Sequence, residues 1–140
     1  MDSTITNFLT TNWMLIAVAF ASGAMLIFPA IQRGRGGPVL STLEATRLIN
    51  SKDAVVIDVR DQGDYAKSHI TNAKNIPEKL LAERKAELDK LKGVPFIVAC
   101  ATGQRAPSAA EAIRKLGFDE VFVLNGGQSA WTQAGLPVTK

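Results

Sequence analysis

A strand, a loop and a helix are predicted to meet around the stretch Phe96-Ile97-Val98-Ala99-Cys100-Ala101-Thr102-Gly103-Gln104-Arg105. The apolar residues 96–99 predict a buried strand, and residues 106–117 predict a helix with Pro107 in its first turn, where proline is tolerated. Cys100, the only cysteine, therefore stands at a strand–loop–helix junction. Because the N–H groups of such a loop and the positive end of the helix favour an anion, we expect a reactive thiolate there.

Strands and helices alternate on both sides of this junction. The run from Ala54 to Val59 is almost continuously apolar, which is typical of a strand buried on both faces of a parallel sheet. Ser41 and Glu44 form a capping-box pattern at the start of a helix that ends near Asn50. The pattern predicts a three-layer α/β domain with a parallel sheet, whose remaining strands cover 73–76 and 121–124 and whose remaining helices cover 78–91 and 128–134.

The first part of the chain has a different character. Trp13 to Ile31 are 19 consecutive residues without a charge, and as a helix they would extend roughly 28 Å, close to the thickness of a bilayer's hydrocarbon core. Arg33 and Arg35 follow at once, whereas no Lys or Arg precedes the run. The positive-inside rule then predicts a single-pass helix in a bacterial cytoplasmic (inner) membrane, with the N-terminus outside and residues 39–140 in the cytoplasm.

A cleaved signal peptide and a buried core helix are the alternatives for this run. A signal peptide needs a basic segment before a shorter apolar core, and that segment is missing. Small residues at helical spacing, such as Ala17 and Ala21, either occur by chance in an apolar helix or would let two spans approach closely, which leaves other membrane proteins open as partners. The predicted organisation is a short tail over 1–12, a transmembrane helix over 13–31, a Gly/Arg linker over 32–38 and a domain over 39–140.

Composition excludes several classes of function. The chain has 140 residues, 46% of them hydrophobic and 21% charged, which fits one globular domain with an appendage. Lys and Glu alternate along the domain without a basic cluster, so no nucleic-acid partner is expected. With one cysteine the chain cannot form an internal disulfide. One cysteine and one histidine are also too few for a metal site, and no cofactor is expected.

Four stretches, in order, resemble the rhodanese-like sulfurtransferases, and in particular their single-domain, membrane-anchored group. Each motif alone is weakly specific, but the four together are strongly so, and they cover the chain from about Pro38 to its end. In chain order they are Ile57–Arg60 with Tyr65 and His69-Ile70, then Ala73–Pro77, then the hexad Cys100–Arg105, and finally Gly126-Gly127 with Ala130-Trp131 and Gly135–Pro137.

The resemblance implies a three-layer α/β/α fold with a five-stranded, mainly parallel sheet, and it implies an enzyme, a rhodanese-type (thiosulfate) sulfurtransferase. Cys100 would take a sulfane sulfur from thiosulfate or a small or protein-borne persulfide and pass it to a thiol or cyanide. Backbone N–H groups of the loop would hold the charge of the bound sulfur, and Gly103 would permit the required backbone angles. The expected substrate-binding residues are Ala101, Thr102, Gly103, Gln104 and Arg105.

The roles of the neighbouring charged residues stay open at this stage. Arg105 would either add positive charge at the mouth of the loop or brace the loop through a carboxylate. Asp58 and Arg60, at the end of a buried strand, would either form a supporting ion pair or contact the substrate. In this family the histidine that corresponds to His69 is structural, and we expect Trp131 to pack in the core.

Two features of the hexad bear on substrate and on rival functions. Two-domain thiosulfate enzymes of the family carry basic residues directly after the cysteine, where this chain has Ala101 and Thr102, so its pocket would hold less charge for a dianionic donor. Related phosphatases and arsenate reductases place five residues between cysteine and arginine, and only four separate Cys100 from Arg105. A non-catalytic, membrane-tethered binding module is the other alternative.

Overall fold

A computed structural model describes the backbone of residues 3–35 and 37–140 and the side chains of residues 3–28 and 37–140. The chain divides into two compact units, Met1–Arg33 and Gly34–Lys140. Residues 1–2 of the predicted tail and residue 36 of the predicted linker lie outside the described residues.

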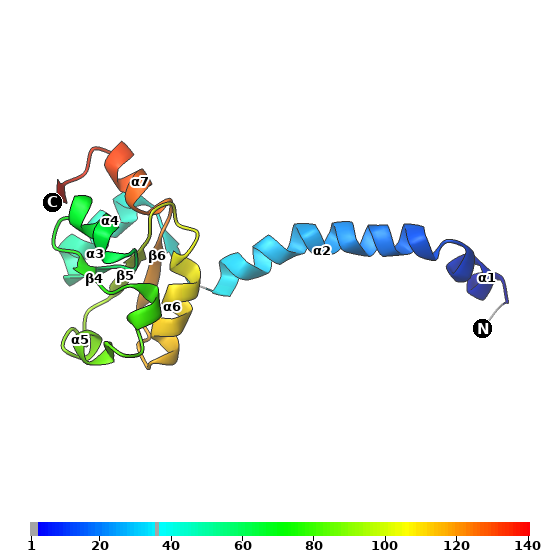
Figure 1. The fold of residues 1–140 in the computed structure, drawn as a ribbon, viewed down its shortest axis with the longest axis horizontal. Coiled ribbons are helices and arrows are strands. Elements are labelled where there is room, and N and C mark those ends of the chain that lie inside the picture. Colours follow the sequence, from blue (N-terminus) through cyan, green and yellow to red (C-terminus); the bar gives the residue numbers. More distant parts are fainter. Residues whose placement is uncertain (1–2, 36) are drawn as a thin grey trace. The chain divides into compact units, whose positions relative to one another are not determined.

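The N-terminal unit consists of helices. Helix α1 covers Ser3–Thr11, within the predicted tail, and α2 covers Trp13–Arg35, so it continues past the predicted end at Ile31 into the predicted linker (Figure 1). Large apolar side chains such as Leu15 and Phe20 are exposed along α2. Among the described residues, no single helix is sufficiently long and apolar to cross a membrane; α1 and residues Trp13–Phe28 would suffice only together, as a pair bent by 70°.

Five parallel strands form the central sheet of the second unit. Their order is β1-β6-β5-β2-β4, so β5 lies in the middle with β6 and β2 beside it. The family's five-stranded parallel sheet is thus confirmed. The strands are β1 (Val39–Leu40), β2 (Val55–Asp58), β4 (Lys74–Asn75), β5 (Phe96–Ala99) and β6 (Val121–Leu124).

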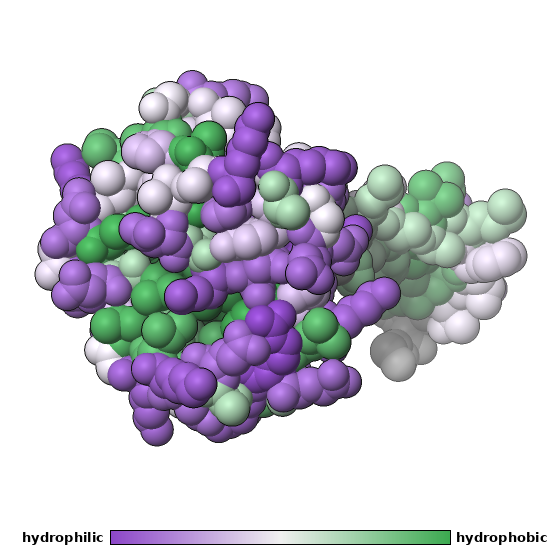
Figure 2. All heavy atoms as spheres, turned by 60° about the vertical axis from the view of Figure 1, so that its left-hand side comes forward, coloured by the Kyte–Doolittle hydropathy of each residue, from purple (hydrophilic) through white to green (hydrophobic). Residues whose placement is uncertain are grey.

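Helices cover both faces of this sheet (Figure 1). Because side chains alternate along a strand, Ile57, Phe96 and Val98 face the layer with α5 (Lys85–Asp89) and α6 (Ala106–Lys115). Val56 and Ile97 face the other layer, which includes α3 (Thr42–Lys52) and α7 (Gly127–Gln133), while α4 (Gln62–Lys67) follows β2. Outside these two cores, hydrophilic side chains cover most of the domain face in Figure 2.

The start of α3 confirms the predicted capping box. The backbone N–H of Glu44 donates to Ser41 Oγ (3.3 Å), and the backbone N–H of Ser41 donates to Glu44 Oε2 (2.8 Å). The backbone N–H and the hydroxyl of Ser41 both donate to Glu44 Oε2, and these two bonds hold the pKa of Glu44 below its usual value. Two donors that a helix N-terminus would otherwise leave without partners are therefore satisfied within four residues.

Three parts of the prediction were wrong or incomplete. The segment 78–91 is not one helix: a 3₁₀ turn, η1 (Glu78–Leu80), is followed by four turn residues and the short α5. Tertiary bonds hold its first turn, because the Glu78 N–H donates to the Val59 carbonyl (3.2 Å). Strand β1 was not expected, nor was a second, antiparallel sheet of β3 (His69–Ile70) and β7 (Val138–Thr139).

Candidate active site

Cys100 follows the last residue of the central strand directly and is 2% exposed. The loop turns back toward the cysteine, so that the Gly103 N–H donates to Cys100 Sγ over 2.9 Å. Gly103 has a φ of +87°, which a residue with a Cβ rarely adopts. The predicted anion-holding role of the loop thus has one observed contact, a backbone donor at the sulfur itself.

The start of α7 packs against the same loop. The backbone N–H of Gln128 donates to the Cys100 carbonyl (2.8 Å), and that of Ser129 donates to the Ala101 carbonyl (3.0 Å). A Cβ added to Gly127, whose φ is +57°, would come within 2.2 Å of the Cys100 oxygen. The Gly126-Gly127 pair therefore lets a helix end meet the cysteine loop backbone to backbone.

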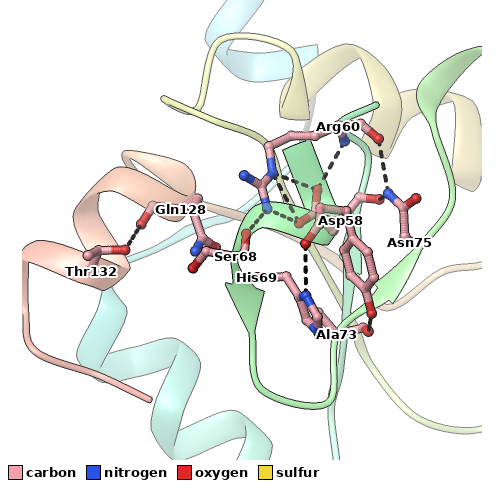
Figure 3. A network of polar contacts seen from close by, with 9 residues as sticks. Asp58, Arg60, Ser68, His69, Ala73, Asn75, Gln128 and Thr132 are labelled. Carbon is pink, nitrogen blue, oxygen red and sulfur yellow. Dashed lines mark hydrogen bonds and ion pairs between the residues drawn. The ribbon is translucent and has the colours of Figure 1, made fainter. Parts of the chain in front are cut away.

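Asp58, which is buried, and Arg60, which is half-buried, form an ion pair at the end of β2 (Figure 3). Arg60 Nη2 donates to Asp58 Oδ2 (2.7 Å) and to the Ser68 carbonyl (2.8 Å), while its Nε donates to both carboxylate oxygens (3.0 and 3.1 Å). Asn75 Nδ2 donates to the carbonyls of both residues. The two side chains thus form an ion pair, and Arg60 also lines the hollow described next.

A hollow of about 250 Å³ opens beside the cysteine. Its walls come from the segments that follow β2 and β5, two neighbouring strands from which the chain continues to opposite sides of the sheet. Open α/β sheets bind ligands at such a point, outside the carboxyl ends of the strands. The lining residues are Arg60, Asp61, Asp64, Cys100, Ala101, Thr102, Gln104 and Arg105.

The hollow brings together most of the residues predicted for the site. Gly103 supports the sulfur from within the loop and does not line the hollow, and Asp58 lies behind Arg60. Asp61 and Asp64 were not among the residues predicted from the sequence, although both follow the same strand as Arg60. Arg105 is exposed at the hollow and has no carboxylate partner in the described part of the chain, so bracing through a carboxylate is not observed.

His69 and Trp131 lie away from this hollow. The Nδ1–H of His69 donates to the Tyr65 carbonyl (2.9 Å), and its ring stacks on that of Tyr65 with centroids 3.8 Å apart (Figure 3). Burial, together with the charge of Asp58, raises the pKa of Tyr65, whose hydroxyl donates to the Ala73 carbonyl (2.7 Å). Trp131 is buried in the second core.

Gln128 was not singled out by its sequence either. It is 9% exposed, and its Oε1 has no hydrogen-bond partner among the described residues. Its backbone carbonyl accepts from Thr132 Oγ1 over 2.9 Å (Figure 3). Among residues 3–28 and 37–140, whose side chains the structure describes, no three or more His, Cys, Asp or Glu form a cluster that could hold a metal.

A family model described as the rhodanese-like domain matches residues 41–134. The chain belongs to the rhodanese-like family. The matched segment contains the cysteine loop, the ion pair and the Gly126-Gly127 contact. This rhodanese-like domain therefore contains the whole hollow.

Individual relatives agree with this placement. The chain is 41% identical over 103 residues to the uncharacterized protein YibN of Escherichia coli K12, covering 73% of this chain and 72% of YibN. It is 39% identical over 92 residues to the thiosulfate sulfurtransferase GlpE of Coxiella burnetii (strain RSA 331), covering 66% and 84%. A rhodanese-related protein from Thermoplasma volcanium superposes with a TM-score of 0.65 at 27% identity, covering 73% of this chain and 97% of that one. These relatives support a sulfurtransferase-type role for this rhodanese-like domain.

Proposed function

We propose that the protein is a sulfurtransferase that carries sulfur as a persulfide on Cys100. The observation that carries the proposal is the 2.9 Å contact between the Gly103 N–H and Cys100 Sγ, in a loop whose cysteine lines a hollow of about 250 Å³. A donor aimed at this sulfur, and fixed before the reaction, stabilises negative charge there without reorganisation.

The reaction proceeds in two balanced steps. The Cys100 thiolate attacks the outer, sulfane sulfur of thiosulfate or a persulfide, a new S–S bond forms, and sulfite or a thiolate leaves with the electron pair of the broken bond. An acceptor thiolate or cyanide then attacks the outer sulfur of Cys100–S–S⁻, and Sγ leaves as a thiolate. No external oxidant or reductant is needed, and the two half-reactions give ping-pong kinetics.

The test is the Cys100→Ser variant assayed with thiosulfate and cyanide. We expect sulfur transfer to fall to the uncatalysed rate, because an alkoxide oxygen cannot store sulfane sulfur as a persulfide. The midpoint of urea unfolding should change little, since the side chains are nearly isosteric. Turnover at the wild-type rate in Cys100→Ser would refute the proposal.

We further propose that residues 13–31 anchor the protein in a bacterial cytoplasmic membrane, with the domain on the cytoplasmic side. The uncharged run, Arg33 and Arg35 on its domain side, and the exposed apolar side chains of α2 support this topology. A reporter that is active only in the cytoplasm, fused after Lys140, should be active in membrane fractions. A reporter that is active only in the periplasm should be inactive when fused at the same position. Activity of the periplasmic reporter and inactivity of the cytoplasmic one would overturn the proposed orientation.

A further inference from the structure

The hollow beside Cys100 carries charges of both signs, and they are not equally engaged. The Arg60 guanidinium is bound to Asp58 through Nε and Nη2 and also to the Ser68 carbonyl, so its positive charge is balanced behind the wall. Asp64 Oδ1 accepts from Lys67 Nζ over 3.2 Å. Two charged side chains of the wall remain, Asp61 and Arg105.

The Asp61 carboxylate does not accept the backbone hydrogen bond that is usual at its position. It is the N-cap residue of α4, a position at which aspartate usually accepts a bond from an N–H of the first turn, yet its side chain makes no capping bond. It is exposed, lines the hollow and has no ion pair among the residues that the structure describes. Its negative charge is therefore available to a ligand.

Arg105 supplies the opposite charge. It closes the cysteine loop as the N-cap residue of α6, its carbonyl accepts from Ser108 Oγ (3.0 Å), and its exposed side chain lines the same hollow. No carboxylate pairs with it in the described part of the chain. One free anion and one free cation thus face a single small cavity in which Cys100 is the only nucleophilic sulfur.

We propose that this hollow selects α-amino-acid thiols, with the ammonium group at Asp61 and the carboxylate at Arg105. The inference rests on the proposed function and names the acceptor class for its second step. The thiolate of the amino acid attacks the outer sulfur of Cys100–S–S⁻, the bond to Sγ breaks, Sγ leaves as a thiolate, and an amino-acid persulfide is released. The reverse reaction accepts the same persulfide as a donor.

A dianion such as thiosulfate suits these walls less well. It would find one uncompensated arginine and would be repelled by Asp61, and Ala101 and Thr102 add no charge. A zwitterion satisfies both free groups with one ligand and leaves no charge of the wall unpaired.

Four acceptor thiols distinguish the ammonium contact at Asp61 from the carboxylate contact at Arg105. The full-length chain in detergent is first loaded with sulfur, its loading is checked by intact mass, and the rate of sulfur transfer is measured to each acceptor. Cysteine carries both charged groups, cysteamine only the ammonium, 3-mercaptopropionate only the carboxylate, and 2-mercaptoethanol neither. Because their thiol acidities differ, each variant is compared with wild type for the same acceptor.

Asp61→Asn should slow transfer to cysteine and cysteamine about threefold, the size of an exposed ion pair, and leave the other two acceptors unchanged. Arg105→Gln should slow sulfur transfer to cysteine and to 3-mercaptopropionate by a similar factor. Arg105→Lys should keep much of the wild-type rate with both acceptors. Both effects should shrink in high salt. Asp119→Asn, which removes an exposed carboxylate before β6, at the opposite end of the sheet from Cys100, is the charge-matched control and should change none of the four rates.

Equal effects of Asp61→Asn on all four acceptors, or no effect on any, would overturn the inference while leaving sulfur transfer by Cys100 intact. Failure of the wild-type protein to load sulfur from any donor would overturn the sulfurtransferase proposal itself, and this inference with it.

Discussion

Gly127 lies so close to Cys100 that a Cβ at residue 127 would stand 2.2 Å from the carbonyl oxygen of the cysteine. The next residue, Gln128, donates its backbone N–H to that same oxygen over 2.8 Å. The cysteine loop is thus held from two sides, by β5 from which it emerges and by the start of α7. The contact joins two parts of the chain that are far apart in sequence, and it fixes the backbone that presents Sγ.

Gly127→Ala should destabilise the domain by about 2 kcal/mol or more, because a strained φ and a steric clash act together. Gly135→Ala is the matched control, since Gly135 also has a positive φ (+69°) but no atom near its added Cβ. That control should cost only about 1 kcal/mol and retain sulfur transfer. Urea unfolding and the rate of sulfur loading measure the difference. Equal stability and equal activity of the two variants would show that α7 does not hold the loop.

Arg60→Met should destabilise the domain by about 3 kcal/mol, because it leaves the carboxylate of Asp58, which is 2% exposed, without its cation. Removing both charges in Asp58→Asn/Arg60→Met should recover much of that loss. Urea unfolding of wild type, both single variants and the double variant gives the coupling free energy of the pair. Additive losses would mean that the two side chains act independently.

Much of this site was predictable from sequence because its elements are local. The buried strand before Cys100, the glycine in the loop and the helix after it are encoded within about twenty consecutive residues, and the capping box of Ser41 and Glu44 within four. Asp61 and Asp64 were also within reach, because they follow the strand adjacent to β5 and ligands bind where neighbouring strands end.

The remaining features depend on contacts that no local pattern encodes. Val39–Leu40 becomes a strand because β6 offers it an edge, and His69–Ile70 because Val138–Thr139 pairs with it. Periodic leucines and charges over 78–91 predicted one helix, but the bond from Glu78 to the Val59 carbonyl begins the segment with a different turn. The close approach of Gly127 to Cys100 is a tertiary contact, and the local sequence around neither residue predicts it.

Tyr65 should titrate above its ordinary pKa of about 10, because burial and the charge of Asp58 disfavour the phenolate. It is the only tyrosine in the chain, so its ultraviolet difference spectrum reports this residue alone. Since the folded-state pKa is the higher one, its contribution to stability is complete below pH 10 and is lost as the pH rises through the folded-state pKa. A midpoint at or below 10 in the folded protein would contradict the described environment.

Ser41→Ala should destabilise the domain by about 1 kcal/mol at pH 7, as expected for loss of an N-cap. The bonds to Ser41 lower the pKa of Glu44, so the stability that Glu44 contributes is complete above its unfolded-state pKa and is lost as the pH falls through the lower, folded-state value. The difference between wild type and Ser41→Ala should therefore shrink at acid pH. Urea unfolding of both proteins at pH 7 and pH 3 tests this, and a difference independent of pH would contradict it.

Intact-protein mass before and after exposure to thiosulfate or a small persulfide tests the central claim most directly. The wild-type chain should gain the mass of one sulfur atom, cyanide or dithiothreitol should remove it, and Cys100→Ala should never acquire it. An unchanged mass with every donor, or the same gain in Cys100→Ala, would contradict the account and favour a binding module without sulfur chemistry.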